Sequence, residues 1–132
     1  MGDQLDTPKQ VVARYFECQR SGDLVKSLDL MTPDVTWTVP GDWEMAGVRD
    51  RSALETMLAE LNVFESGLEF EHQSVTAEED RVVVFTHVTG KLLDGRVYRN
   101  AIVFIFEIEN GKIRSVVEMP DSAKSRAFWL GK

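Results

Sequence analysis

The sequence predicts an α+β fold in which helices come first and a curved antiparallel sheet follows. Two hairpin signals support the sheet, because Asp94-Gly95 and Asn110-Gly111 each separate long runs rich in apolar residues. Period-two patterning supports the same conclusion and predicts four antiparallel strands, over residues 68–78, 81–93, 96–109 and 112–119. The helical patterns precede these strands, and this segregation along the chain is typical of α+β proteins and not of α/β proteins.

Three helices are predicted before the sheet. Thr7 caps the first, with proline next and Gln10 three positions after the cap, and Gly22 suits its C′ position. A short second helix is expected from Asp23 to Met31, because Thr32-Pro33 would stop it. The third begins at the capping-box pattern of residues 52–55 and carries an apolar stripe as far as Leu61.

A short strand and a loop lie between the second and third helices. Residues 35–39 alternate apolar and polar side chains, which predicts a strand that ends at Pro40-Gly41. The following segment, Gly41 to Gly47, contains Trp43 and Met45, more apolar side chain than a solvated connector needs. We expect this loop to close over a pocket.

Composition limits the classes of function. The 132 residues fit one domain spanning 1–132, with 43% hydrophobic and 28% charged residues. A net charge of −7 repels phosphate backbones, so nucleic acid is not an expected partner. The first residues do not resemble a signal peptide and no apolar run is long enough to span a membrane, so a cytoplasmic protein is expected. Cys18 is the single cysteine and is interpreted as a structural thiol.

Metal and cofactor chemistry finds little support in the sequence. With two histidines and one cysteine there is no metal-ligand spacing, and no glycine-rich phosphate loop is present. The predicted site is therefore independent of a metal or a cofactor.

The order of these elements resembles that of the SnoaL-like proteins over nearly the whole chain. The most specific stretch runs from Tyr98 to Glu118 and includes the run from Val103 to Phe106 and Gly111-Lys112-Ile113. Ketosteroid isomerase, scytalone dehydratase, limonene epoxide hydrolase, polyketide cyclases and nuclear transport factor 2 belong to the same wider group. The resemblance implies a cone-shaped curved sheet wrapped around a deep apolar pocket that the helices close. It also implies a homodimer through the outer face of the sheet.

Glu118 is the first candidate catalytic residue. It lies five residues after Ile113, where the resemblance implies an inward-facing acid. A carboxylate among apolar strand residues loses hydration, which raises its pKa toward a value useful for proton transfer. The chain has Glu where the relatives have Asp, so the carboxylate is displaced by about one methylene. The alternative is a structural carboxylate paired with a neighbouring arginine, with Arg114 and Val116 expected on the same face as Glu118.

His87 is the second candidate catalytic residue. It follows the apolar run of residues 82–85, and Phe85, His87 and Thr89 would share one face of their strand. Histidine titrates near neutral pH, so His87 is expected to relay or donate a proton. The epoxide hydrolase pattern places Arg and Asp where this chain has His87 and Thr89, and this departure argues against epoxide hydrolysis. A histidine hydrogen-bonded inside a partly polar interior is the alternative.

Substrate-binding residues are expected on the same face of the sheet. Tyr98 and Asn100 share a strand face with Ile102, Phe104 and Phe106, so their polar tips would orient a developing oxyanion in an apolar cavity. The alternative is that Asn100 satisfies backbone groups. The remaining candidates for the apolar wall are aromatic: Tyr15, Trp37, Trp43, Phe85, Phe104 and Phe106.

Two other polar residues receive structural interpretations. Asp121 is interpreted as a helix cap after the last strand. His72 lies among charged strand residues and is interpreted as a solvated or dimer-facing side chain.

The sequence therefore predicts a protein that binds a small, apolar, cyclic or polyketide-like carbonyl compound. Acid/base catalysis of the isomerase, cyclase or dehydratase (lyase) type is expected, with Glu118 as base and no cofactor. The alternative is a non-catalytic ligand-binding or protein-association module, since fold does not fix chemistry.

Overall fold

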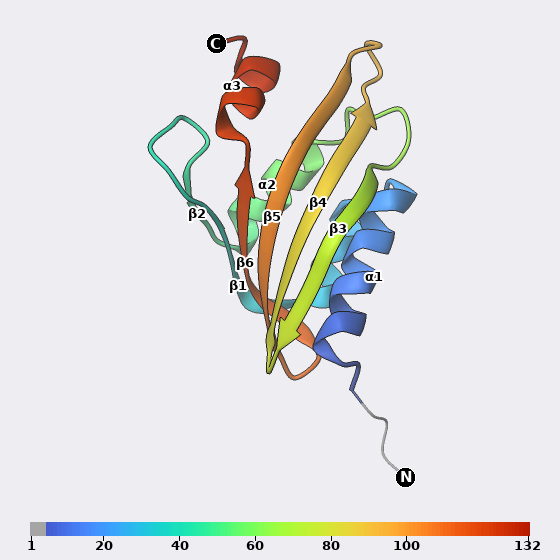
Figure 1. Ribbon diagram of the computed structural model, residues 1–132, viewed down its shortest axis with the longest axis vertical. Helices are drawn as coiled ribbons and strands as arrows, with labels where there is room; N and C mark the ends of the chain where they lie inside the picture. Colours follow the sequence, from blue (N-terminus) through green and yellow to red (C-terminus); the bar gives the residue numbers. More distant parts are fainter. Residues whose placement is uncertain (1–4) are drawn as a thin grey trace.

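A single curved sheet organises the computed structural model, which describes residues 5–132 (Figure 1). Its six strands are β1 (Met31–Val39), β2 (Gly47–Arg49), β3 (Glu69–Glu78), β4 (Arg81–Lys91), β5 (Val97–Glu109) and β6 (Lys112–Pro120). The helices are α1 (Pro8–Ser21), the 3₁₀ helix η1 (Val25–Leu30), α2 (Arg51–Glu60) and α3 (Ser122–Leu130). The predicted α+β class is confirmed.

The sheet is mixed, whereas we had expected a purely antiparallel one. Its order is β2-β1-β6-β5-β4-β3, and β1 pairs with β6 in parallel while the other neighbours are antiparallel. The predicted hairpins from β3 to β6 are present. The parallel pair joins residues about 80 positions apart, as in Trp37 opposite Val116, which local periodicity cannot reveal.

The two predicted hairpin turns differ in geometry. Asn110 and Gly111 have φ of 50° and 75°, as a type I′ turn requires. In the other turn Gly95 has a φ of 93°, but Asp94 is not in the positive-φ region. The Leu92 N–H instead donates to the Arg96 carbonyl at 2.8 Å and closes a three-residue loop. A glycine at the last position of such a loop is the common alternative to a two-residue turn.

The first helix confirms its predicted ends. The Thr7 side chain accepts from the Gln10 N–H, and the Gln10 side chain accepts from the Thr7 N–H, which completes the capping box. Gly22 ends the helix with a φ of 86°.

Other boundaries differ from the prediction. The expected second helix is a 3₁₀ turn, and β1 already begins at Met31, so Pro33 lies within a strand. The β1–β6 register shifts between Met31 and Thr36, and a proline is tolerated there because an irregular ladder does not need its missing N–H. Strand β2 was not predicted, nor was the extent of α3. The predicted helix cap at Asp121 is confirmed, because its side chain accepts from the Lys124 N–H at the start of α3.

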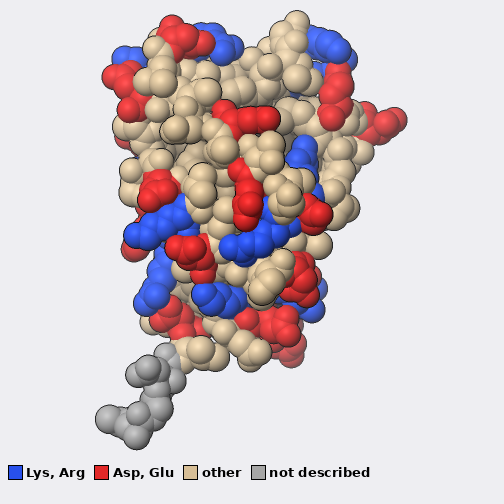
Figure 2. All heavy atoms as spheres, turned by 180° about the vertical axis from the view of Figure 1, so that it is seen from behind, with Lys and Arg blue, Asp and Glu red and all other residues tan. Residues whose placement is uncertain are grey.

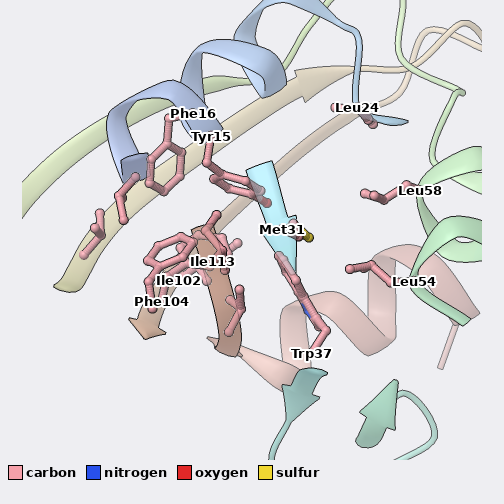
Figure 3. Packing of buried hydrophobic residues seen from close by; sticks show 14 of the residues in the cluster. Tyr15, Phe16, Leu24, Met31, Trp37, Leu54, Leu58, Ile102, Phe104 and Ile113 are labelled. Atoms are coloured by element: carbon pink, nitrogen blue, oxygen red, sulfur yellow. The ribbon is translucent and has the colours of Figure 1, made fainter. Parts of the chain in front are cut away.

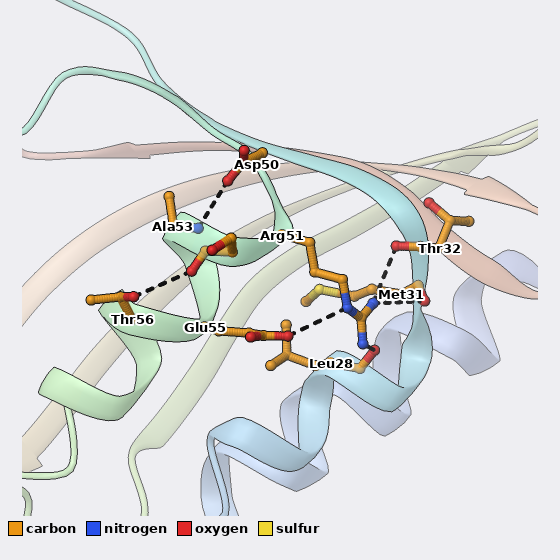
Figure 4. Close-up of polar contacts among 9 residues, drawn as sticks. Leu28, Met31, Thr32, Asp50, Arg51, Ala53, Glu55 and Thr56 are labelled. Atoms are coloured by element: carbon orange, nitrogen blue, oxygen red, sulfur yellow. Dashed lines mark hydrogen bonds and ion pairs between the residues drawn. The ribbon is translucent and has the colours of Figure 1, made fainter.

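Arg51 connects the start of α2 to the end of η1 and the start of β1 (Figure 4). Its guanidinium donates to the carbonyl oxygens of Leu28 at 3.0 Å, Met31 at 3.3 Å and Thr32 at 3.2 Å. Asp50, two residues before the cap we expected, caps α2 by accepting from the Ala53 N–H. The end of η1, the start of β1 and the start of α2 are thus held at one point.

The core lies between the sheet and the helices (Figure 3). Tyr15 and Phe16 of α1 pack near Phe104 of β5, with ring centroids 6.4 Å and 5.5 Å from it. Leu54 and Leu58 extend from α2 toward the strand that carries Met31 and Trp37. Helix α1 packs against β3 to β6, α2 packs against β1, and α3 packs against β5 and β6.

The surface carries charges of both signs. Figure 2 shows acidic and basic side chains interspersed over the face opposite that of Figure 1. Within residues 5–132, no helix combines the length and the apolar character needed to cross a membrane.

Candidate active site

A small inner cavity of about 120 Å³ lies between the sheet and the helices. Helix α1 contributes Tyr15 and Gln19, and β1 contributes Trp37. Further lining residues come from β5, β6, α2, α3 and the loops, among them Tyr98, Ile102, Phe104, Glu118, Met57, Leu61 and Trp129. Most of these side chains are apolar, and the volume is below the roughly 300–1,000 Å³ of common ligand pockets, so only a small ligand fits without side-chain movement.

Glu118 brings a carboxylate into this cavity from β6. It lies opposite Phe104 in the sheet register, and its Oε1 accepts a hydrogen bond from Trp37 Nε1 at 3.2 Å. Burial raises the pKa of Glu118, while the Trp37 hydrogen bond and the charge of Arg49 oppose the rise. The inward position that we predicted for Glu118 is therefore observed.

The alternative interpretation of Glu118, an ion pair with a neighbouring arginine, is not seen. Arg114 is exposed and pairs with Glu107 at 2.7 Å. No ion pair between described residues includes Glu118. The β5–β6 register shifts between Glu107 and Ile108, opposite this part of β6, which removes Arg114 from the face that Glu118 and Val116 share.

Tyr15 is a second titratable group near Glu118. Burial first, and then the nearby Glu118 carboxylate, hold the pKa of Tyr15 well above its ordinary value. Its phenol therefore stays protonated and presents a neutral polar tip to the cavity.

Among the cavity residues that sequence reasoning missed, Gln19 and Arg49 carry nitrogen donors. Gln19 is 3% exposed, and its Nε2 has no acceptor among the described residues. Arg49 lies opposite Trp37 in the β1–β2 register and donates from Nη2 to the Met45 carbonyl at 2.9 Å. Its Nη1 is also buried without an acceptor in the described chain. Gln19 could have been found as a polar residue four positions after Tyr15 on the buried face of α1, whereas Arg49 lay outside every predicted element.

Tyr98 and Asn100 face inward as predicted, but their polar atoms are already used. The amide nitrogen of Asn100 donates to Tyr98 Oη at 2.9 Å and to Ser125 Oγ at 2.9 Å. Its amide oxygen accepts from the backbone N–H groups of Ala101 and Asp121. Asn100 is not among the cavity-lining residues, although Tyr98 is. These contacts favour the alternative in which Asn100 satisfies backbone groups, here by fastening α3 to β5.

His87 and Phe85 lie on the other side of the sheet, which corrects our expectation for both. They alternate with the buried Val84, Thr86 and Val88, and Phe85 is 38% exposed. Their rings contact each other at a centroid distance of 5.5 Å, away from the inner cavity. His87 therefore cannot relay a proton to a ligand in this cavity.

His72 is also placed differently from our expectation. It is half-buried, its ring centroid lies 4.5 Å from that of Phe16, and its Nδ1 is 2.9 Å from Thr86 Oγ1. Burial lowers the pKa of His72, with a smaller contribution from Arg20. His72 thus belongs to the edge of the core and not to a solvated surface.

The remaining aromatic candidates divide between cavity and core. Tyr15, Trp37, Trp43 and Phe104 line the cavity. Trp43 donates from Nε1 to the Pro40 carbonyl within its own loop, and Trp43 and Met45 both line the cavity, so this loop lies at the cavity as predicted. Phe106 is fully buried and stacks on Phe104 at 5.7 Å, but it does not line the cavity.

An outer cleft of about 510 Å³ adjoins the inner cavity. Met45, Met57, Leu61 and Trp129 line both spaces, and we call these four residues the cleft wall. They come from the loop before β2, from α2 and its C-terminal end, and from α3. Access from the cleft to Glu118 therefore passes these side chains.

The polar side chains that the described residues bring to the cavity are one carboxylate, one guanidinium, one amide, two phenols, one hydroxyl and three indoles. Within residues 5–132, no group of three or more His, Cys, Asp and Glu side chains is arranged to hold a metal ion. Among the described residues that line the cavity, Glu118 is the one with a carboxylate.

Comparison with known proteins agrees with this architecture. The profile of the SnoaL-like domain matches residues 12–116. No curated protein matches the chain in sequence. An NTF2-like protein from Burkholderia xenovorans LB400 is 26% identical, with coverage of 94% of this chain and 98% of that one and a TM-score of 0.68.

Two further solved structures show the same fold. An NTF2-like protein from Anabaena variabilis ATCC 29413 is 26% identical, with 89% and 92% of the two chains covered and a TM-score of 0.72. IdmH, a candidate polyketide cyclase from Streptomyces antibioticus, is 22% identical, with 96% and 100% covered and a TM-score of 0.73. The predicted resemblance is confirmed at the level of family and fold.

Proposed function

Since the chain belongs to the SnoaL-like domain family, we propose that it binds a small, largely apolar carbonyl compound in the inner cavity and transfers a proton on it. One observation carries this proposal, namely that Glu118 is the single carboxylate that the described chain contributes to an otherwise mostly apolar cavity. Its raised pKa makes the ionised form a stronger base than an exposed carboxylate.

The proposed step is proton abstraction next to a carbonyl. The Glu118 carboxylate accepts the proton, the carbon–hydrogen bond breaks, and its electron pair moves so that the carbonyl oxygen becomes an enolate. Return of the proton to a different carbon gives an isomer, and loss of a leaving group from the enolate gives a lyase product. Neither outcome requires a redox cofactor.

Trp37 positions the base for this step. Its Nε1 donates to Oε1 of Glu118, whereas Oε2 accepts no hydrogen bond from the described residues. The Trp37 ring thereby fixes the carboxylate and leaves one oxygen available to the ligand. Trp37 is only 2% exposed and tightly packed, so its hydrogen bond restricts rotation of the Glu118 carboxylate before a ligand binds.

Deuterium uptake by a probe ketone tests the proposal. Indan-1-one in D₂O exchanges the hydrogens beside its carbonyl, and mass spectrometry follows the exchange. We expect the protein to accelerate uptake above the buffer rate and Glu118→Gln to reduce the accelerated rate by about 100-fold or more, the usual size of a general-base contribution. Glu109→Gln, which removes an exposed carboxylate at the end of β5, should leave the rate unchanged.

Two results would count against the proposal. Deuterium uptake at the buffer rate in the presence of the unmodified protein would contradict proton abstraction as its function. Accelerated uptake that survives in Glu118→Gln would assign the base to another group.

A second candidate function is association through the outer face of the sheet, without catalysis. Phe85 is 38% exposed there, and Val83, Val103, Ile105 and Val117 are half-buried neighbours on β4, β5 and β6. Apolar residues gathered on an outer sheet face favour burial against a second copy of the chain. We propose that the chain forms this dimer and also binds a ligand in the inner cavity. A role in association alone would not explain why Glu118 lines that cavity.

A further inference from the structure

Two residues that line the inner cavity each carry a buried nitrogen without a hydrogen-bond partner in the described chain. Gln19 Nε2 and Arg49 Nη1 are both buried, and neither has an acceptor among residues 5–132. A buried donor without a partner costs free energy, about 1–3 kcal/mol for a neutral group and more for a charged one, so such groups are rare in folded proteins. Both residues line the same cavity as Glu118, from α1 and from β2.

Arg49 also brings an unpaired positive charge to the cavity. It takes part in none of the ion pairs between described residues. The interaction between Glu118 and Arg49 is a longer-range electrostatic attraction, since no hydrogen bond or ion pair joins the two side chains. A guanidinium in this position favours a negatively charged oxygen on a bound molecule, because charge-assisted hydrogen bonds are the stronger ones.

The donors first expected to bind such an oxygen are engaged elsewhere. Tyr98 Oη and the Asn100 amide bond to each other and to Ser125. Moving either group toward a ligand would break the contacts that hold α3. A ligand could accept from Gln19 Nε2 or Arg49 Nη1 without breaking a hydrogen bond, because neither nitrogen has a partner in the described chain.

We propose that Arg49 Nη1 and Gln19 Nε2 form the oxyanion-binding site of the inner cavity. The ligand then carries an oxygen that is negatively charged when bound, such as an enolate, with a second acceptor oxygen for Gln19. This inference rests on the proposed function, because it places the enolate oxygen formed when Glu118 removes a proton. The proton goes to Glu118, and the electron pair ends on the oxygen that faces Arg49.

A matched pair of probes tests this assignment by isothermal titration calorimetry. Indane-1,3-dione forms an enolate readily and has two oxygens, whereas indan-1-one has the same rings, one oxygen and no acidic character at neutral pH. We expect the unmodified protein to bind the dione at least about tenfold more tightly than the monoketone at pH 7. Arg49→Met should abolish most of that preference, and Gln19→Leu should reduce it by a smaller factor.

Controls separate this role from a merely structural one. Arg49→Lys keeps the charge and should retain part of the preference, while Arg114→Met removes an exposed positive charge near the other end of β6 and should retain all of it. The preference should also fall as the pH drops far enough to protonate the dione. If Arg49→Met does not fold, Arg49→Lys and Gln19→Leu carry the test, and the full preference in both variants overturns the assignment.

The outcomes distinguish this inference from the proposed function. Equal affinity for both probes in the unmodified protein, or a preference that survives in Arg49→Met, overturns the oxyanion assignment and leaves proton abstraction by Glu118 standing. Failure of both probes to bind overturns the two together.

Discussion

Replacing Glu118 with glutamine should stabilise the folded protein at neutral and alkaline pH, although it removes the proposed catalytic base. The pKa of Glu118 is raised above its ordinary value of 4.5, because burial penalises the charged form more than Trp37 and Arg49 favour it. The folded state therefore binds this proton more tightly than the unfolded state does. The stability that comes from the proton is fully present below about pH 4.5 and is lost as pH rises through the folded-state pKa.

The magnitude follows from how much more tightly the folded state holds the proton. Above both pKa values, every tenfold difference in proton affinity between the folded and unfolded states lowers the unfolding free energy by about 1.4 kcal/mol. Glutamine has nearly the same shape, still accepts a hydrogen bond from Trp37 Nε1 and does not ionise, so the variant avoids this cost. For a domain of this size, a change of about 1 kcal/mol corresponds to a change of about 4 °C in Tm.

Urea unfolding between pH 4 and pH 9 measures the effect. The difference in unfolding free energy between Glu118→Gln and the unmodified protein should grow as pH rises and then level off. Glu109→Gln, an exposed carboxylate, is the control and should run parallel to the unmodified protein. Parallel profiles for Glu118→Gln and the unmodified protein would refute the argument that burial controls the ionisation of Glu118.

Three other substitutions test separate parts of the structure. Asn100→Leu removes the side-chain acceptor of the Ala101 and Asp121 N–H groups, of which Asp121 keeps the Ala101 carbonyl, and should lower the unfolding free energy by roughly 1–3 kcal/mol. Amide exchange in α3 should become faster, and unchanged protection there would contradict the fastening role. Gly67→Ala places a Cβ against the Arg20 carbonyl at the end of α1 and should lower the unfolding free energy in urea by about 1–3 kcal/mol. An unchanged midpoint would show that the chain at Gly67 can move away from the end of α1 at little cost. Phe85→Lys should convert a dimer to a monomer in sedimentation velocity, and an unmodified protein that is already monomeric would rule out the outer-face dimer.

Much of the fold was predictable because its signals are local. The capping box at Thr7 and the glycine at the end of α1 specify that helix within one turn of each end. The Asn110-Gly111 turn specifies the β5–β6 hairpin, since few residues adopt positive φ at two successive positions. The β1–β6 pairing was not predictable, because its specificity comes from packing between distant segments.

The two catalytic candidates show why strand facing is harder to predict. On β4 the residues of both faces are apolar, with Val82 and Val84 inside and Val83 and Phe85 outside, so alternation could not say which face His87 joins. For Glu118, the family resemblance indicated the inward face, and the structure agrees, with Val116 two residues earlier fully buried. Arg49 lies in a three-residue strand too short to produce any periodic signal.

The position of the cleft wall has a consequence for how this protein can change over time. The four residues Met45, Met57, Leu61 and Trp129 line both the outer cleft and the inner cavity, and none of them belongs to the sheet. Glu118, Trp37 and Arg49, by contrast, all lie on strands. Substitutions in the wall can therefore change which ligands the proposed site accepts while Glu118 keeps its hydrogen bond from Trp37. The two methionines are unbranched and adapt to many shapes, so selectivity can drift in small steps without a new active site having to arise.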